Sequence, residues 1–301
     1  MPAQWNFFFG GTMQLDRIRR RAAVQFITPA VIVLASLNLF PFFYALWMSF
    51  HKVGLAGRVQ PKWAGVDNYT QAFNDERIWS ATIASATFVT GAVVVEILLG
   101  TAMAFVFNQK LHGLDYMRRI SILPVMVMPI VTALVWFYMF NPNFGLVNWL
   151  FSFLGMEKRD WLTTEGLAMA GVIAADVWQW TPFVMLVVFA GLQSLPEYIF
   201  EAAKMDGLSK WQTLVRVTLP MLQPTILVVL LIRLVDSFKT MELVFIMTRG
   251  AGSTEILPYY VYLNAFVFRN LVGYAAVISL FMIVLITVAA QLIAKRIRPD
   301  E

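Results

Sequence analysis

The sequence predicts an all-α integral membrane protein with six transmembrane helices, and three observations lead to this fold class. Hydrophobic residues make up 59% of the 301 positions and charged residues only 14%, whereas a soluble domain carries about 25% charged residues. The apolar residues are gathered into six runs, each reaching the roughly 20 residues that a helix needs to cross a bilayer. The runs do not alternate apolar with polar residues as barrel strands do, so helices are expected.

The six predicted spans account for most of the chain. They cover residues 22–50, 79–107, 120–140, 167–193, 219–247 and 272–294. The first run is too long for the h-region of a cleaved signal peptide, which has about 7–15 residues. The absence of cysteine and the presence of two histidines exclude disulfides, thiol catalysis and zinc sites built from cysteine and histidine. The net charge of +5 requires no nucleic-acid partner, because basic loops are typical of membrane proteins.

The distribution of lysine and arginine predicts the orientation of the chain. These residues are more numerous in the N-terminal segment 1–21, in the loops after the second and fourth spans, and in the tail 295–301 than in the three remaining loops. Basic loops stay on the cytoplasmic side of a membrane. We therefore expect both termini in the cytoplasm, with 1–21 and 295–301 as cytoplasmic segments on either side of a transmembrane domain at 22–294.

The cytoplasmic loop between the fourth and fifth spans has the sequence pattern of two short helices joined by a turn. Ser194 and Glu197 fit a capping box at the start of the first helix, and Gly207 is placed to end it. Ser209 and Gln212 fit a second capping box. A helix–turn–helix unit is therefore expected directly outside the membrane.

Apolar residues recur at helical spacing along both predicted helices of this loop, interrupted by charged residues. The apolar positions are Tyr198, Ile199, Ala202, Met205, Trp211, Leu214, Val215 and Thr218. Such a pattern is typical of a helix pair that lies on lipid headgroups, and equally of a surface that docks another protein. Side-chain chemistry alone leaves both interpretations open.

One motif in the loop resembles a known family. Glu201-Ala202-Ala203 is followed after three residues by Gly207, and after nine more by Val217-Thr218-Leu219-Pro220. This spacing resembles the EAA loop of ABC importer permeases, and the flanking sequences resemble the carbohydrate-import, maltose-type branch. The sequence departs from the family at Val217, where Ile is usual, and at 248–252, where a Gly-Gly-Gly-Pro-like run is common.

The resemblance implies the type I permease fold of ABC importers, with a cytoplasmic coupling helix in the loop 194–220. It implies that Glu201, Ala202, Ala203, Asp206 and Gly207 couple the chain to an ATPase. The implied partners are a second homologous permease, two ABC ATPase subunits and an extracytoplasmic substrate-binding protein, together with membrane lipid. The implied location is the bacterial cytoplasmic (inner) membrane.

The sequence also indicates where ATP is bound. A Walker A motif needs the dipeptide Gly-Lys, and no lysine of this chain follows a glycine. We therefore expect no cofactor in this chain, and ATP and Mg on the partner subunits.

Charged residues inside the fifth span predict either a salt-bridge ladder or a substrate path. The charges at three-residue steps are Arg233, Asp236, Lys239 and Glu242. Neighbours at this spacing can pair along one helix. Alternatively, Arg233, Asp236, Ser237 and Thr240 form a stripe at positions i, i+3, i+4 and i+7 that faces an aqueous cavity. The resemblance supports substrate contacts from this stretch.

The fourth span adds candidates for the same path. It contains Asp176, Trp178, Gln179, Trp180 and Phe183. Aromatic faces can cover the C–H faces of a sugar while polar groups bond its hydroxyls, although a single tryptophan more commonly packs in a core. We expect Gln179, Trp180 and Phe183 to line the path. Glu96 in the second span is either a hydrogen-bonding contact between helices or a gate residue.

The predicted function is the permease subunit of an ATP-driven importer for a sugar or polyol. An ion-coupled secondary carrier is the alternative, in which Asp236 or Glu96 would titrate and no ATP would be needed. A membrane-embedded hydrolase or transferase is disfavoured, because His51 and His112 fall on opposite sides of the membrane. The sequence leaves open whether the solute is a sugar, a polyol or a sugar phosphate, and whether the binding protein sets the selectivity.

Overall fold

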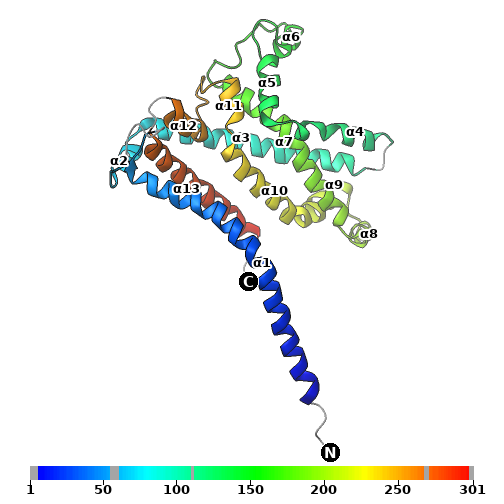
Figure 1. The fold of residues 1–301 in the computed structure, drawn as a ribbon. Coiled ribbons are helices and arrows are strands. Elements are labelled where there is room, and N and C mark those ends of the chain that lie inside the picture. Colours follow the sequence, from blue (N-terminus) through cyan, green and yellow to red (C-terminus); the bar gives the residue numbers. More distant parts are fainter. Residues whose placement is uncertain (1–5, 55–60, 110–111, 268–270, 298–301) are drawn as a thin grey trace, which may run out of the picture.

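The computed structural model of the chain describes residues 6–54, 61–109, 112–267 and 271–297, and its architecture is helical. Within these ranges, five helices are long and apolar enough to cross a membrane, and one bent helix pair provides a possible sixth crossing. This confirms the predicted all-α membrane fold (Figure 1). The long helices are α1 (Asn6–Ser49), α3 (Glu76–Phe107), α7 (Leu167–Ser194), α10 (Leu219–Lys239) and α13 (Val272–Ile297).

Shorter elements connect the long helices. Before the bent pair they are strands β1 (His51–Lys52) and β2 (Lys62–Trp63), which pair antiparallel, and helix α2 (Asp67–Phe73). The bent pair comprises α4 (Leu114–Ser121), the 3₁₀ turn η2 (Leu123–Met126) and α5 (Pro129–Met139). The others are α6 (Leu146–Ser152), α8 (Glu197–Met205), α9 (Lys210–Thr213), the π-helical turn η3 (Leu214–Thr218), α11 (Glu242–Met247), α12 (Leu257–Tyr262) and the π-helical turn η4 (Leu263–Val267).

Helices α3 and α7 form the most extensive helix pair, and α10 packs against both of them and against α13. The close approach of α3 and α7 depends on Gly100, because a Cβ at this position would lie 2.6 Å from Cβ of Val184 and 3.0 Å from the backbone nitrogen of Met185. The largest apolar core fills the space among these helices, α5 and α11, and includes Phe88 and Val172. This core holds α7 and α10, the two helices that flank the predicted coupling loop, in one body.

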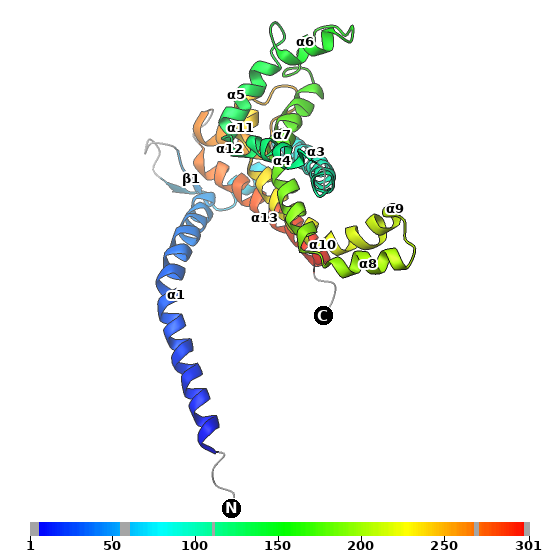
Figure 2. The same cartoon turned by 90° about the vertical axis from the view of Figure 1, so that its right-hand side faces the viewer.

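Helix α1 lies apart from this body. It packs on α13 near its C-terminal end and extends away from the rest of the chain toward its N-terminal end (Figures 1 and 2). No residue in its most apolar window is buried within the chain. Phe26 and Phe40, for example, are 84% and 70% exposed. The apolar surface of α1 is therefore available to lipid or to another subunit.

The predicted third span, 120–140, is not one continuous helix. The chain is bent by 99° between the segment Leu114–Met126 and α5. Pro124 and Pro129 explain the break, because proline supplies no N–H donor and disfavours the helical conformation of the preceding residue. The carbonyl of Val127, released at the break, accepts a hydrogen bond of 2.8 Å from Nε2 of Gln179 on α7.

The end of the molecule opposite the coupling loop is fastened by polar contacts. Asp75 caps α3 by accepting the N–H of Arg77, and its other oxygen accepts the hydroxyls of Tyr260 and Tyr274 at 2.7 and 2.5 Å. Burial raises the pKa of Asp75, but these hydrogen bonds and the charge of Arg77 outweigh it, so that the pKa lies below its ordinary value. Arg77 also forms a two-bond ion pair with Glu255 at 2.7 and 2.6 Å. These contacts join α3 to α12 and α13.

Candidate functional site

The predicted helix–turn–helix between the fourth and fifth spans is present as α8 and α9. Helix α8 ends at Met205, and the turn that follows it contains Gly207, whose φ of +74° is a left-handed conformation that favours glycine. The N–H groups of Gly207 and Leu208 donate to the carbonyls of Lys204 and Ala203. The two short helices project from the body beside the ends of α7 and α10 (Figure 2).

One of the two predicted capping boxes is confirmed and the other is wrong. At α9 the hydroxyl of Ser209 accepts the N–H of Gln212, while the N–H of Ser209 donates to Gln212 Oε1 at 2.8 Å. At α8 the N-cap is Pro196, and no side chain caps it. Ser194 instead ends α7 and donates its hydroxyl to the carbonyl of Gly191. Leu195, which precedes a proline, is extended, so the next helix begins only at Glu197.

The five residues predicted to couple the chain to an ATPase lie on α8 and the turn that follows it. Ala203 is buried, and the other four are exposed: Glu201, Ala202, Asp206 and Gly207. Tyr198 and Met205 on the same helix are 69% and 88% exposed. Thus α8 fixes one side on the body and leaves a carboxylate and large apolar side chains uncovered. The part of the chain described here offers no cover for them.

The connections of the two short helices to the spans differ. Between α7 and α8, Leu195 and Pro196 have extended backbone conformations, with ψ of 132° and 133°. Between α9 and α10 the π-helical turn η3 continues the helix without a break, so that the chain is helical from Lys210 to Lys239. A displacement of α9 is therefore transmitted directly to α10, whereas α8 is tethered to α7 through a short extended link.

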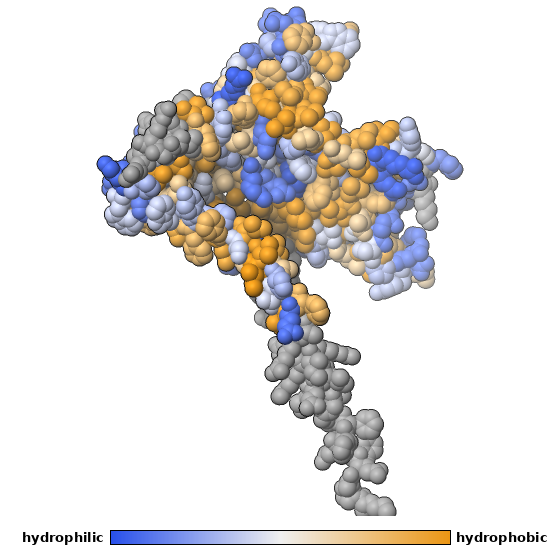
Figure 3. Space-filling view, viewed as in Figure 1, coloured by the Kyte–Doolittle hydropathy of each residue, from blue (hydrophilic) through white to orange (hydrophobic). Residues whose placement is uncertain are grey.

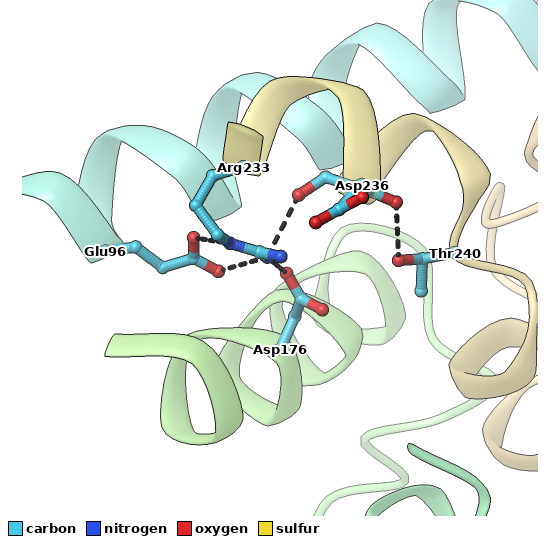
Figure 4. A network of polar contacts seen from close by, with 6 residues as sticks. Glu96, Asp176, Arg233, Asp236 and Thr240 are labelled. Carbon is cyan, nitrogen blue, oxygen red and sulfur yellow. Dashed lines mark hydrogen bonds and ion pairs between the residues drawn. The ribbon is translucent and has the colours of Figure 1, made fainter. Parts of the chain in front are cut away.

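A buried ion network joins three spans near the middle of the molecule (Figure 4). The guanidinium of Arg233 on α10 donates two hydrogen bonds to Glu96 on α3, from Nε at 2.6 Å and from Nη2 at 2.9 Å. Its Nη2 also lies 2.9 Å from Oδ2 of Asp176 on α7 and 3.0 Å from Oγ of Ser237. All four side chains are at most 1% exposed.

The network brings two carboxylates to one guanidinium. Because buried charges are stable only when they are paired and hydrogen-bonded, Glu96, Asp176 and Arg233 stabilise one another. Oδ1 of Asp176 is buried without a hydrogen-bond partner. The guanidinium also lies over the ring of Trp180, with its central carbon 4.6 Å from the ring centroid. These contacts bind α3, α7 and α10 together at the level of the fifth-span charges.

The predicted stripe on the fifth span is divided between the core and the surface. Arg233 and Ser237 are buried in the network, while Asp236 and Thr240 are partly exposed. Of the predicted ladder, the described residues contain only the Asp236–Lys239 pair, at 3.3 Å with both side chains about half exposed. Arg233 pairs across the helices instead of along its own, so it is not available to a solute as the sequence pattern indicated.

The three candidates on the fourth span also separate. Gln179 is buried and bonds the bent third span through Val127, as described above. Trp180 and Phe183 are partly exposed and meet edge to face, with ring centroids 6.4 Å apart. Gln179 is therefore enclosed between α7 and the bent third span, whereas the rings of Trp180 and Phe183 are partly open at the surface.

The sequence left Glu96 as either a hydrogen-bonding contact between helices or a gate residue, and its two hydrogen bonds to Arg233 confirm the contact between helices. Asp176, a fourth-span candidate for the path, is instead a buried partner of Arg233. The sequence did not predict that the two carboxylates share one guanidinium, although an acidic group in an apolar span requires a partner.

The partly exposed polar residues gather on a hollowed face. Figure 3 shows a hydrophilic patch over the junction of α10 and α11, surrounded by apolar surface. The helix is interrupted there at Thr240, which has an extended conformation, and the charged residues at the junction are Asp236, Lys239 and Glu242. Glu242 accepts the N–H of Met241 at 3.1 Å. A polar patch within an otherwise apolar helical protein marks a solute path or a polar subunit contact.

A protein with apolar spans, an internal polar patch and an exposed helical elbow belongs to the class of multi-span transport proteins. Residues 96–299 match the family described as "Binding-protein-dependent transport system inner membrane component". The chain belongs to this family and is the permease subunit of a binding-protein-dependent ABC importer.

Several relatives match over most of their length. The chain is 31% identical to the trehalose/maltose transport system permease protein MalF of Thermococcus litoralis, over 96% of this chain and 98% of the relative. It is 31% identical to the trehalose transport system permease protein SugA of Mycobacterium tuberculosis, over 92% and 88%. The fold is similar to that of a chain in the crystal structure of a bacterial alginate ABC transporter, with a TM-score of 0.78, 20% identity and coverage of 92% and 94%.

Proposed function

We propose that this permease moves a sugar or polyol, delivered by an extracytoplasmic binding protein, across the inner membrane with energy from ATP hydrolysed on separate subunits. The names of the relatives, which are permeases for trehalose, maltose and sulfoquinovosyl glycerol, support this solute class. The observation that carries the proposal is the exposed helix α8, which bears the Glu201-Ala202-Ala203 signature and is held on the body by Ala203.

The coupling step follows from how the loop is connected. Helix α8, which leaves Glu201 and Met205 uncovered, docks on an ATPase subunit that carries ATP and Mg. When the ATPase subunits close, α8 and α9 are displaced together, because the capped turn at Gly207 and Ser209 joins them rigidly. The continuous helix through η3 passes this displacement to α10, and the ion network passes it to α3 and α7.

The arrangement of the ends agrees with the predicted topology. The N-terminal end of α1, the C-terminal end of α13 and the pair α8–α9 lie toward one end of the molecule, and α6 lies at the other (Figure 2). Lys295 and Arg296 in the last turn of α13 are on the same side as the coupling loop. By the positive-inside rule this end is cytoplasmic. Both termini are then inside, and α6 and α12 are outside.

The remaining partner is a second homologous permease. The described residues of this chain leave most of helix α1 and the hollowed face uncovered. A polar patch at Asp236, Lys239 and Glu242 cannot face hydrocarbon at low cost, so it lines an aqueous path that a second permease closes. Trp180 and Phe183 add aromatic faces for the solute to the same path.

The proposal is tested by separating ATP hydrolysis from uptake. The four-subunit transporter with its binding protein is reconstituted in vesicles, and two changes are made in the loop: Glu201→Lys, which reverses the exposed charge of α8, and Gly207→Pro, which cannot adopt a φ of +74°. We expect both variants to insert into the membrane but to lose most solute-stimulated uptake relative to ATP hydrolysis. Glu157→Lys, an equal charge reversal at an exposed position outside the coupling loop, is the control.

Two results would contradict the proposal. The first is coupled uptake in both loop variants at the level of the control, which would remove the docking role of α8. The second is uptake by the permease without any nucleotide, which would favour the ion-coupled carrier instead.

A further inference from the structure

In addition to the hollowed face, the described part of the chain has a pocket at its outer end. This pocket has a volume of about 470 Å³ and is formed by α5, α11 and the segment α12–η4. Its volume falls in the range of roughly 300–1,000 Å³ that is typical of small-molecule sites. Its lining contains Arg249 and five aromatic residues, which are Phe137, Tyr138, Phe245, Tyr259 and Tyr262. None of these residues belongs to the ion network or to the hydrophilic patch.

The aromatic rings are ordered against one another; Tyr259 is buried, whereas Tyr138, Phe245 and Tyr262 remain open to a ligand. Tyr259 and Tyr262 are stacked with centroids 6.3 Å apart, and Phe245 meets both of them edge to face at 6.3 and 5.3 Å. Phe245 is 40% exposed and Tyr138, across the pocket on α5, is 57% exposed. Exposed aromatic faces held in place by neighbouring rings can cover the C–H face of a pyranose without losing side-chain entropy.

Arg249 supplies a cation held by the backbone. Its φ of +52° is unusual for a residue with a side chain, and its N–H donates to the carbonyl of Val244 at 2.7 Å, two features that fix where the side chain starts. Among the described residues, Arg249 forms no ion pair, in contrast to Arg233 and to Arg77. The lining of the pocket contains no carboxylate.

The charged side chain of the pocket lining is a donor, and the tyrosine hydroxyls can both donate and accept. A guanidinium offers five N–H donors in a planar fork that matches a carboxylate, and tyrosine hydroxyls can add further bonds. A site for a neutral sugar gains from carboxylate or amide acceptors for the sugar hydroxyls, and this pocket has none on its side chains. A guanidinium without a carboxylate in the same lining favours a negatively charged ligand.

We propose that this outer pocket binds an acidic pyranoside, with Arg249 paired to its carboxylate and Phe245 and Tyr262 against its ring face. The proposal rests on the proposed function, which places the pocket on the outer side and assigns the solute to the carbohydrates. It adds a substrate class that the membrane-embedded Arg233 cannot select, because Glu96 and Asp176 neutralise that guanidinium. The pocket then holds the acidic solute before it reaches the hydrophilic patch.

The test is calorimetric titration of the purified, assembled transporter with digalacturonate and with its neutral counterpart galactobiose. We expect the wild-type complex to bind digalacturonate at least 10-fold more tightly than galactobiose, with an affinity that falls as salt is added. Arg249→Gln is expected to weaken digalacturonate binding at least 10-fold and to leave galactobiose binding unchanged. Tyr262→Ala should weaken both probes, because it removes a ring face.

Arg159→Gln, the same change at an exposed arginine outside the pocket lining, should leave both affinities at the wild-type values. Arg249→Lys, which retains the charge without the fork, should give an intermediate affinity for digalacturonate. Failure of the wild-type complex to bind digalacturonate, equal binding of the two probes, or wild-type affinity in Arg249→Gln would each overturn the proposal. Measuring ATP-driven uptake in parallel distinguishes a failure of the pocket proposal from a failure of the importer proposal. Normal uptake without Arg249-dependent binding rejects only the pocket. Arg249-dependent binding without ATP-driven uptake rejects only the importer function.

Discussion

Replacement of Arg233 by methionine is expected to destabilise the transporter strongly. The change removes the only cation that contacts Glu96 and Asp176, two carboxylates that are fully buried among the described residues. Breaking a buried ion pair on one side costs about 3–5 kcal/mol, because the remaining charge is left without compensation. Since 1 kcal/mol corresponds to roughly 2–4 °C for a chain of 150–250 residues, a fall in the melting temperature of about 10 °C is expected.

The matched control is Lys239→Met on the same helix. Lys239 also pairs with an acidic residue, Asp236 at 3.3 Å, but both side chains are about half exposed. An exposed pair of this kind contributes about 0–1 kcal/mol, so a shift of at most a few degrees is expected. The assay is size-exclusion chromatography of the detergent-purified complex after heating to a series of temperatures. Equal shifts in the two variants would refute the reasoning that burial determines the cost.

A third variant separates charge from packing. In the combination Glu96→Gln, Asp176→Asn and Arg233→Met, no ionised group is left unpaired in the network. Because replacing a whole buried ion network is often neutral, this variant should recover most of the stability that Arg233→Met loses. A melting temperature as low as that of the single variant would assign the loss to packing.

Two further predictions concern the outer end and the hydrophilic patch. The pKa of Asp75 lies below its ordinary value of 3.8, so in acid the unfolded chain takes up a proton more readily than the folded chain. This carboxylate therefore stabilises the fold above pH about 4, and its contribution is lost as the pH falls below that value. Asp75→Asn, which leaves Tyr260 and Tyr274 without a charged acceptor, should lower the melting temperature at pH 7 and remove this part of the acid dependence, measured from pH 7 to 3. Asp236→Ala should raise the KM for solute uptake several-fold while assembly is unchanged. The rise in KM should be larger than in Lys239→Ala, which breaks the same ion pair. Equal kinetics in the two variants would reduce Asp236 to a structural role.

The helices could be predicted from the sequence more completely than their contacts. Five of the six predicted apolar runs contain a long helix, because a run of this length has no other way to satisfy its backbone groups in lipid. The bend in the third span was missed although Pro124 and Pro129 are visible, since apolar composition dominates a search for spans. The predicted capping box at Ser194 is wrong because Leu195 and Pro196 are extended, which delays the start of α8 to Glu197.

The site could be predicted in part for a similar reason. The elbow that carries Glu201 and Gly207 is specified by local signals, namely caps, glycine and spacing, and these signals are contained within the loop. The ion network is not local, because Arg233 meets Glu96 at a separation of 137 residues. A ladder along one helix is the simpler interpretation of alternating charges, and only the packing of α3 against α10 shows that the partner lies on another span.

The contact between α1 and α13 has a consequence for the biogenesis of the protein. These are the first and the last long helices of the chain, and about 220 residues separate Ser49 from Val272. At a synthesis rate of about 5–20 residues per second, α1 emerges from the ribosome roughly 10–45 s before the helix on which it packs. During that interval α1 lacks the helix on which it packs, and its apolar surface is left to lipid or to another protein.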